Sequence, residues 1–209
     1  MKNTATRVKT AEVRLMYCHL DEPQAFDESQ KAKYSVSMII KKDDKDTLGQ
    51  IKKNYEEAVQ KGIEKYGQGF SKNVTPMVRP QGSNNGLLID SDQDDRYMDD
   101  ADFKGTYILS AKAINKPMCV AKETGRKPLE GEELKEIIYS GCYGKVLFNF
   151  YPFNAGINKG VACGLDSVMK TRDGESLGGR VNAMDYFGDE LDQATEGALV
   201  ADDDPFGDF

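Results

Sequence analysis

The sequence predicts a mainly β protein, a small barrel or curled sheet with one substantial helix in an early connection. Five or more short segments carry the alternation, or the β-branched and aromatic residues, that is typical of strands. Only one segment has a long helical period, whereas a parallel α/β sheet needs a helix between most of its strands. The 209 residues are enough for one sizeable domain or two small ones.

The first two predicted strands are RVKTAEVRLMY (7–17) and KYSVSMIIK (33–41), separated by the polar loop HLDEPQAFDESQK. In the second strand apolar residues alternate with polar ones, which predicts one core face and one solvent face. The core face holds Tyr34, Val36, Met38 and Ile40, and the solvent face holds Lys33, Ser35, Ser37 and Lys41.

The one clear helix follows the second strand. Apolar residues recur there at three- and four-residue steps and form a single stripe: Leu48, Ile51, Tyr55, Val59, Ile63 and Tyr66. Thr47 with Gln50 fits a capping box at its start, and Gly67 suits its end.

The remaining strands come after a proline-broken loop that carries Arg79. They are GLLID, GTYILSAKA (105–113), PMCVA, CYGKVLFNFYPF (142–153) and GVACGLDSVMKTRDG (160–174). Glycine and acidic residues dominate from Leu177, and beyond Gly188 we expect disorder. The sequence therefore predicts a domain over residues 1–187 and a disordered acidic tail over residues 188–209.

Composition places the chain among cytoplasmic proteins. No apolar run approaches the roughly 20 residues of a membrane span, and the start has no apolar block of signal-peptide type. The four cysteines, Cys18, Cys119, Cys142 and Cys163, form no CxxC pair, so we expect free thiols in a reducing compartment and no zinc site with His19.

The net charge of −7 is unevenly distributed. Residues 185–209 hold nine acidic residues and no basic one, and residues 90–102 hold seven aspartates and one arginine. The rest of the chain is therefore basic. Such a body could bind a polyanion, and the acidic tail could compete with that polyanion for the basic surface.

No motif of catalysis is present, and we expect neither a cofactor nor a metal. Asp90, Asp92 and Asp94 have the one-three-five spacing of a calcium loop, but Asp95 stands where the loop needs glycine and Ala101 where it needs glutamate. These aspartates are typical of a solvated loop. A metal-dependent nuclease that uses residues 90–102 is left open as an alternative.

The segment CYGKVLFNFYPF is the strongest strand signal. Alternation puts Val146, Phe148 and Phe150 on a core face. The opposite face carries Tyr143, Lys145, Leu147, Asn149 and Tyr151. Tyrosine rings stack on unpaired bases and lysines neutralise phosphates, although tyrosines that merely cover a sheet are common too.

Further basic residues could extend such a track across the short strands of a barrel. The predicted nucleic-acid-binding set is Lys33, Arg79, Lys112, Lys116, Tyr143, Lys145, Tyr151 and Lys159, with Tyr143, Lys145 and Tyr151 at its centre and Lys112 and Lys116 beside them.

The chain ends in DDDPFGDF, where two phenylalanines stand among acids. A solubility tail does not explain these rings, because a ring on a mobile chain binds well only when it enters a pocket. The sequence predicts a partner-binding tip made of Asp202, Asp203, Asp204, Pro205, Phe206, Asp208 and Phe209.

This tip resembles the acidic C-terminal tips of bacterial and phage single-stranded-DNA-binding proteins. The body is similar to a phage family of such proteins, once known only as a domain of unknown function. The similarity rests on FKGTYILSAKAINKP, IYSGCYGKVLFNFYPF, KGVACGLDSVMKTRDGESLGGR and MDYF, which together span about residues 103–187.

The resemblance implies an OB-like barrel that binds single-stranded DNA with little sequence preference and acts in phage replication or recombination. It also implies that the tail recruits replication or recombination proteins. A structural or regulatory phage protein whose barrel binds protein is a second alternative. The sequence does not fix the oligomeric state, and a homo-oligomer stays open.

Overall fold

The structure is a computed structural model in which residues 7–25, 31–155 and 158–177 are described. Its strands are β1 (Val8–Lys9), β2 (Val13–Gln24), β3 (Lys33–Lys41), β4 (Leu88–Asp90), β5 (Thr106–Ala113), β6 (Met118–Ala121), β7 (Tyr143–Ala155) and β8 (Asn158–Arg172). The helices are α1 (Lys45–Tyr66) and α2 (Gly131–Ile137), with 3-10 turns η1 (Gln68–Asn73), η2 (Ser91–Gln93) and η3 (Ala101–Phe103).

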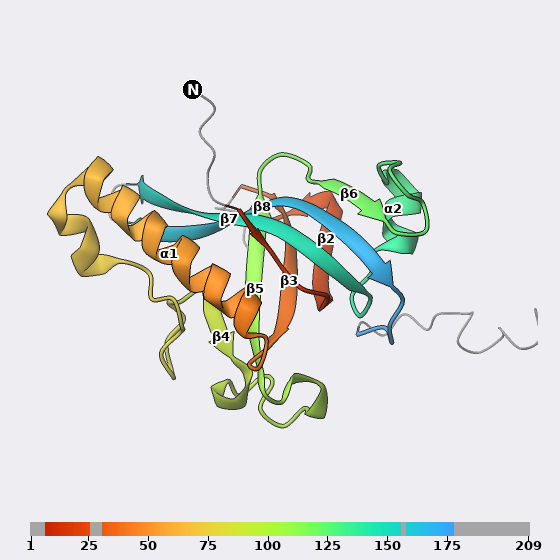
Figure 1. Ribbon diagram of the computed structural model, residues 1–209, viewed down its shortest axis with the longest axis horizontal. Helices are drawn as coiled ribbons and strands as arrows, with labels where there is room; N and C mark the ends of the chain where they lie inside the picture. Colours follow the sequence, from red (N-terminus) through yellow and green to blue (C-terminus); the bar gives the residue numbers. More distant parts are fainter. Residues whose placement is uncertain (1–6, 26–30, 156–157, 178–209) are drawn as a thin grey trace, which may run out of the picture. The chain divides into compact units, whose positions relative to one another are not determined.

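Five strands close into a ring. The hydrogen-bonded order is β7–β2–β3–β5–β8, and β8 returns to pair with β7 along nearly its whole length. All neighbours in the ring are antiparallel except β5 and β8, which run parallel (Figure 1). A five-stranded Greek-key barrel is the architecture of the OB fold, so the predicted fold class is confirmed.

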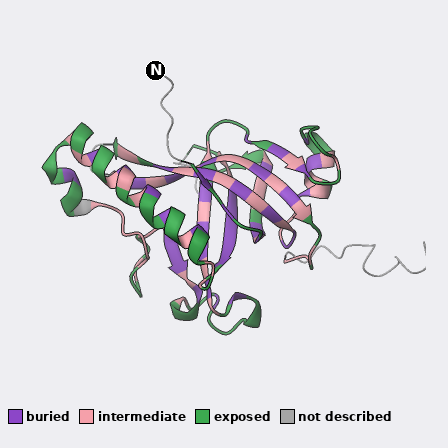
Figure 2. Cartoon of the chain, viewed as in Figure 1, coloured by how far each residue is buried: buried purple, intermediate pink, exposed green. Residues whose placement is uncertain are grey.

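The barrel core follows the predicted alternation. Val36, Met38 and Ile40 of β3 are completely buried, and Phe148 of β7 is buried beside them. Along β7 the outward-facing neighbours are less buried, which produces the alternating colours in Figure 2. In β3 the outward-facing Ser37 and Ile39 are buried as well, so the prediction that Ser37 faces solvent is wrong. Because the side-chain period of a strand is two residues, this register fixes which side chains reach the barrel surface.

Helix α1 packs against the part of the β7–β8 hairpin that extends beyond the barrel (Figure 1). The Tyr55 ring meets Phe150 edge to face at 6.4 Å, and the Tyr55 hydroxyl donates to the Thr75 carbonyl at 2.7 Å. The buried face is centred on Ile51, Ala58 and Gly62, slightly rotated from the predicted stripe. Gly67 ends the helix with a φ of 85°, as predicted.

The predicted capping box is wrong. Asp44 caps α1 by accepting from the Thr47 amide at 3.0 Å. Thr47 is buried, and its hydroxyl accepts from the Ala11 amide at 3.1 Å. A tertiary contact therefore takes the hydroxyl that the sequence pattern assigned to the cap.

The strand predicted over residues 7–17 is divided in the structure. β1 is a separate short strand on β7, and β2 runs on to Gln24, through residues that were predicted as loop. The extension is held by pairing with β3, which continues as far as Gln24 opposite Lys33. Polar residues can belong to a strand where only its backbone is needed for pairing.

A second apolar cluster lies on the outside of β2, β3, β4 and β5. It contains Met16, Ile39, Ile89, Tyr97, Phe103 and Ile108. The acidic segment 90–102 folds over it, held by Ser91, whose buried hydroxyl bonds to the carbonyls of Phe103 and Thr106. The outer face of the barrel is therefore covered at this end and open at the other.

The predicted tail, residues 188–209, lies outside the described residues. Among the described helices, none combines the length and the hydropathy that crossing a membrane would require.

Two glycines of α1 provide a test of this packing. Gly62 faces the buried Phe70 ring, which an added Cβ would overlap, whereas Gly49 has nothing within 4 Å of that position. Glycine to alanine gains about 1 kcal/mol in a helix, and overpacking a core costs about 1–3 kcal/mol. We expect Gly49→Ala to raise the melting temperature and Gly62→Ala to lower it, measured by circular dichroism. A rise with both variants would contradict the packing of Phe70 on α1.

Candidate nucleic-acid interface

The open part of the barrel surface is the outer face of β3 and β5. Their register places Ser37 opposite Ser110 and Ser35 opposite Lys112. The two serine hydroxyls bond to each other at 2.6 Å. Beyond the last β3–β5 pair, Lys33 of β3 continues the same face, and Ile114 follows the end of β5. Ser37 is buried, whereas Ser35 and Ser110 are partly exposed, so the accessible part of this face is polar and carries lysines at one end.

One groove lies on the β2 side of Lys112. It is lined by His19, Gln24, Ala25, Lys31, Lys33, Ser35 and Lys112. Burial, and then the nearby charge of Lys33, lower the pKa of the Lys112 ammonium. Burial also lowers the pKa of His19. Lysines brought this close repel one another, and a bound anion would relieve that repulsion.

A second groove of about 380 Å³ lies on the β8 side of Lys112. Its lining includes Lys112, Ile114, Lys116, Tyr151 and Gly164. The Tyr151 side chain remains 44% exposed on a strand whose inward residues are buried. Lys116 donates to Asp21 at 2.6 Å, which raises the pKa of its ammonium. Lys112 belongs to both grooves and so joins them into one surface.

Tyr17 adds a further aromatic ring that the sequence analysis missed. Met16 pairs with Ser37 and His19 with Ser35, so a bulge in β2 inserts an extra residue between these pairs. Tyr17 occupies this bulge with a φ of 49° and is 53% exposed. A positive φ is rare for a bulky residue and is often retained at functional sites. In the sequence, the alternation of apolar and polar residues breaks at Met16, which follows the apolar Leu15, and this break was the signal that could have indicated the bulge.

Tyr143 and Lys145 lie at the opposite end of β7 from Tyr151. The Arg172 guanidinium covers the Tyr143 ring at 3.4 Å from its centroid and is itself ion-paired to Glu12 at 2.9 Å. Of the three residues predicted at the centre of the site, only Tyr151 therefore lines either groove, the one on the β8 side.

Lys159 lies on the other face of the β7–β8 hairpin from Tyr151. It has the same alternation phase as the buried Val161, and its ammonium donates to the Gly69 carbonyl at 3.4 Å. The structure thus turns Lys159 towards η1, away from the face that carries Lys112.

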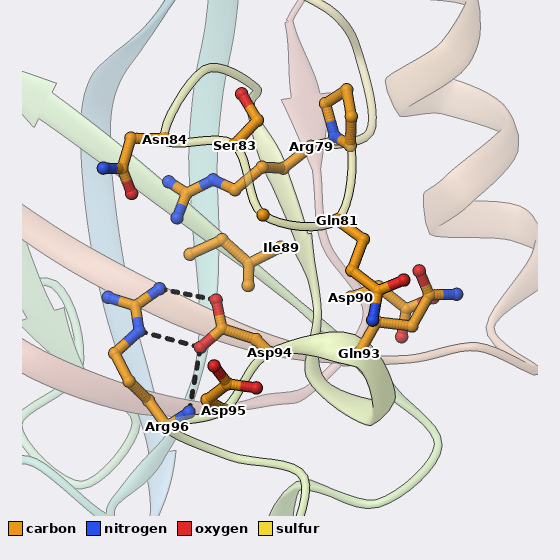
Figure 3. Close-up of a pocket in the computed structure, with 12 residues that line it drawn as sticks. Arg79, Gln81, Ser83, Asn84, Ile89, Asp90, Gln93, Asp94, Asp95 and Arg96 are labelled. Carbon is orange, nitrogen blue, oxygen red and sulfur yellow. Dashed lines mark hydrogen bonds and ion pairs between the residues drawn. The ribbon is translucent and has the colours of Figure 1, made fainter.

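Arg79 lines a third pocket, formed by the loop before β4 and the acidic segment (Figure 3). Its guanidinium extends over Ile89, and Arg96 lies on the other side, paired with Asp94 at 2.8 Å. The Nε atom of Arg79 is buried without a hydrogen-bond partner among the described residues. The Arg79 pocket is separate from the two grooves that meet at Lys112.

The acidic segment 90–102 is partly neutralised by the body of the protein. Lys42 pairs with both Asp90 and Asp92, and Arg14 pairs with Asp102 at 2.8 Å. Within the described part of the chain, no group of three or more histidine, cysteine or acidic residues is placed to hold a metal ion. The geometry gives no support to the alternative of a metal-dependent nuclease.

Residues 6–199 match the family model of the single-stranded-DNA-binding protein of Enterobacter phage Enc34. The chain belongs to this family. It is also 28% identical over 196 residues to protein p50 of Acyrthosiphon pisum secondary endosymbiont phage 1, covering 93% of this chain and 99% of that protein. Membership confirms the family expected from the sequence, which is one of binding proteins and not of enzymes.

Two solved structures support the fold. The Enc34 protein in complex with single-stranded DNA is 26% identical with a TM-score of 0.65, covering 84% of this chain and 91% of that one. The single-stranded-DNA-binding protein gp2.5 of bacteriophage T7 is 17% identical with a TM-score of 0.52, covering 98% of both chains. At that identity the T7 likeness shows the fold alone.

The lowered pKa of Lys112 leads to a prediction about pH. Only the protonated Lys112 ammonium binds phosphate, and a bound phosphate would raise the lowered pKa of this ammonium again. At pH values below the ordinary pKa of lysine, DNA binding is therefore accompanied by protonation of Lys112. We expect affinity for oligo-dA, measured by fluorescence anisotropy, to fall as the pH rises from 7 towards 9.5. Lys112→Arg should flatten this dependence, because arginine stays charged. An unchanged pH profile in Lys112→Arg would exclude Lys112 as its source.

Proposed function

We propose that the chain is a non-enzymatic protein that coats single-stranded DNA along the outer face of β3 and β5. The observation that carries the proposal is the meeting of two grooves at Lys112, with lysines on both sides and an exposed tyrosine at one end. Membership in the Enc34 family and the likeness to a structure that contains single-stranded DNA support it.

The chemistry of this face suits a strand without a fixed sequence. Lysines neutralise phosphates, and the ring of Tyr151 can stack on any base, at about 1–3 kcal/mol per base. The small side chains of Ser35 and Ser110, which are partly exposed, let the strand lie close to the sheet. The contacts proposed here read no base edge, so we expect little sequence preference.

Within the predicted set, Lys33, Lys112, Lys116 and Tyr151 form the centre of the proposed interface. Arg79, Tyr143, Lys145 and Lys159 stay as proposals for a longer path around the barrel. Their single substitutions to alanine should each change affinity less than Lys112→Ala does.

The role of the C-terminal tip stays a proposal that rests on the sequence. We propose that residues 202–209 recruit replication or recombination proteins of the phage cycle, and that the acidic tail competes with DNA for the basic face. The aromatic residues Phe206 and Phe209 suit a pocket with a basic rim, because acids beside a ring steer it there.

The lysines of the interface should set the salt dependence of binding. Each phosphate neutralised on a single strand contributes about 0.7 to the slope of log K against log salt. We expect Lys33→Ala with Lys112→Ala to weaken binding of oligo-dT and to reduce this slope by about 1.4. The matched control is Lys52→Ala with Lys53→Ala, two exposed lysines of α1. An equal effect in both double variants would contradict the proposed face.

Deletion of residues 189–209 tests the proposed competition. At low salt we expect the truncated chain to bind oligo-dT more tightly, because the deletion removes eight of the nine acidic residues of 185–209 and so relieves repulsion of the phosphates. The difference should shrink as salt is added. Weaker binding after truncation would rule out competition, and capture of replication proteins by both forms would rule out recruitment by the tip.

A further inference from the structure

Ile114 is the most exposed large hydrophobic residue of the described chain, at 70%. It follows Ala113, the last residue of β5, and lies in the bend that leads to β6. Lys112 and Lys116 lie on either side of it in the chain and line the same groove. A single exposed isoleucine needs no explanation by itself, but this one lines a groove of the proposed interface together with an aromatic ring.

The aromatic ring is that of Tyr151, which lines the same groove and lies across β8. Because Gly164 has no side chain, it leaves room on β8 for the Tyr151 ring. A Cβ on Gly164 would stand 3.1 Å from the Tyr151 ring and 2.7 Å from the Asn149 amide oxygen. Glycine in a strand often marks a place where another group approaches closely, and here the group is the ring itself.

We infer that this groove holds one unpaired nucleobase of the bound strand between the Ile114 side chain and the Tyr151 ring. The inference rests on the proposed binding of single-stranded DNA and names the subsite in which one base is held. An aliphatic side chain on one face and an aromatic ring on the other remove both faces of a base from water. Apolar side chains, isoleucine included, are known to insert between bases in this way.

The rest of the groove favours a nucleotide over an apolar peptide. Lys112 and Lys116 line the groove with positive charge for the phosphates on either side of a held base, although Asp21 pairs with Lys116 at 2.6 Å and offsets part of that charge. Asp166 also lines the groove, but Arg7 pairs with it at 2.8 Å and offsets its charge. The groove thus combines apolar side chains with positive charge. A nucleotide is complementary to it, because its base has two flat faces that stack on apolar groups and its phosphate is negatively charged.

The decisive variant is Ile114→Ser, and the matched control is Met118→Ser. Met118 is 61% exposed on β6 and does not line the groove. Each protein is titrated by anisotropy with oligo-dT and with an oligonucleotide of equal length whose nucleotides are all abasic. We expect Ile114→Ser to weaken binding of oligo-dT by about 3- to 10-fold, as one face of a stack is lost, and to leave binding of the abasic strand unchanged. Met118→Ser should change neither.

Two further results overturn the inference. If Ile114→Ser weakens both strands equally, Ile114 acts on the backbone or on the fold and holds no base. If Ile114→Ser and Met118→Ser behave alike, the groove is not the subsite. Failure of the proposed function is a different result, because the unchanged protein would then bind neither strand.

A spectroscopic measurement checks the same point independently. The chain has no tryptophan, so Tyr151→Trp introduces a single reporter. Oligo-dT should quench its emission, and Ile114→Ser added to Tyr151→Trp should reduce that quenching at saturation, whereas Ile114→Leu should preserve it. Equal quenching in all three proteins would contradict the sandwich.

Discussion

The pairing of β5 with β8 is the constraint on which the interface depends. These two strands meet in parallel, and their register joins Lys112 to Gly164. This contact closes the barrel and at the same time brings the β7–β8 hairpin, with Tyr151, against the lysine of β5. The same side chains on an open sheet would lie at opposite edges. Closure of the barrel therefore creates the joined grooves as well as the core.

Charge is distributed so that the basic face stays available to a polyanion. The acidic segment 90–102 lies over an outer apolar cluster at the other end of the barrel face, and several of its aspartates are paired with Lys42, Arg14 and Arg96. Much of this negative charge is thus offset locally. The affinity of this face for a polynucleotide then depends on exposed lysines, whose interactions with phosphates weaken as salt is added.

The sequence predicted the parts of the fold that depend on local periodicity. The inward residues of β3 and β7 and the single long helix follow from side-chain alternation and from a three-to-four-residue period. Features that depend on pairing between distant strands could not be predicted. Tyr17 reaches the surface through a bulge, and Tyr143 is covered by Arg172, which lies 29 residues further along the chain. The alternation of β7 placed Tyr143 and Tyr151 on one face, but it did not say what covers each end.

The most direct test of the account is to map the amide chemical shifts of the protein during titration with oligo-dT. We expect the largest changes on the outer face of β3 and β5 around Lys112, and on Tyr151 with Gly164 beside it. Changes confined to α1, or to the end of β7 that carries Tyr143 and Lys145, would contradict it. Either outcome would be visible in the unmodified full-length chain.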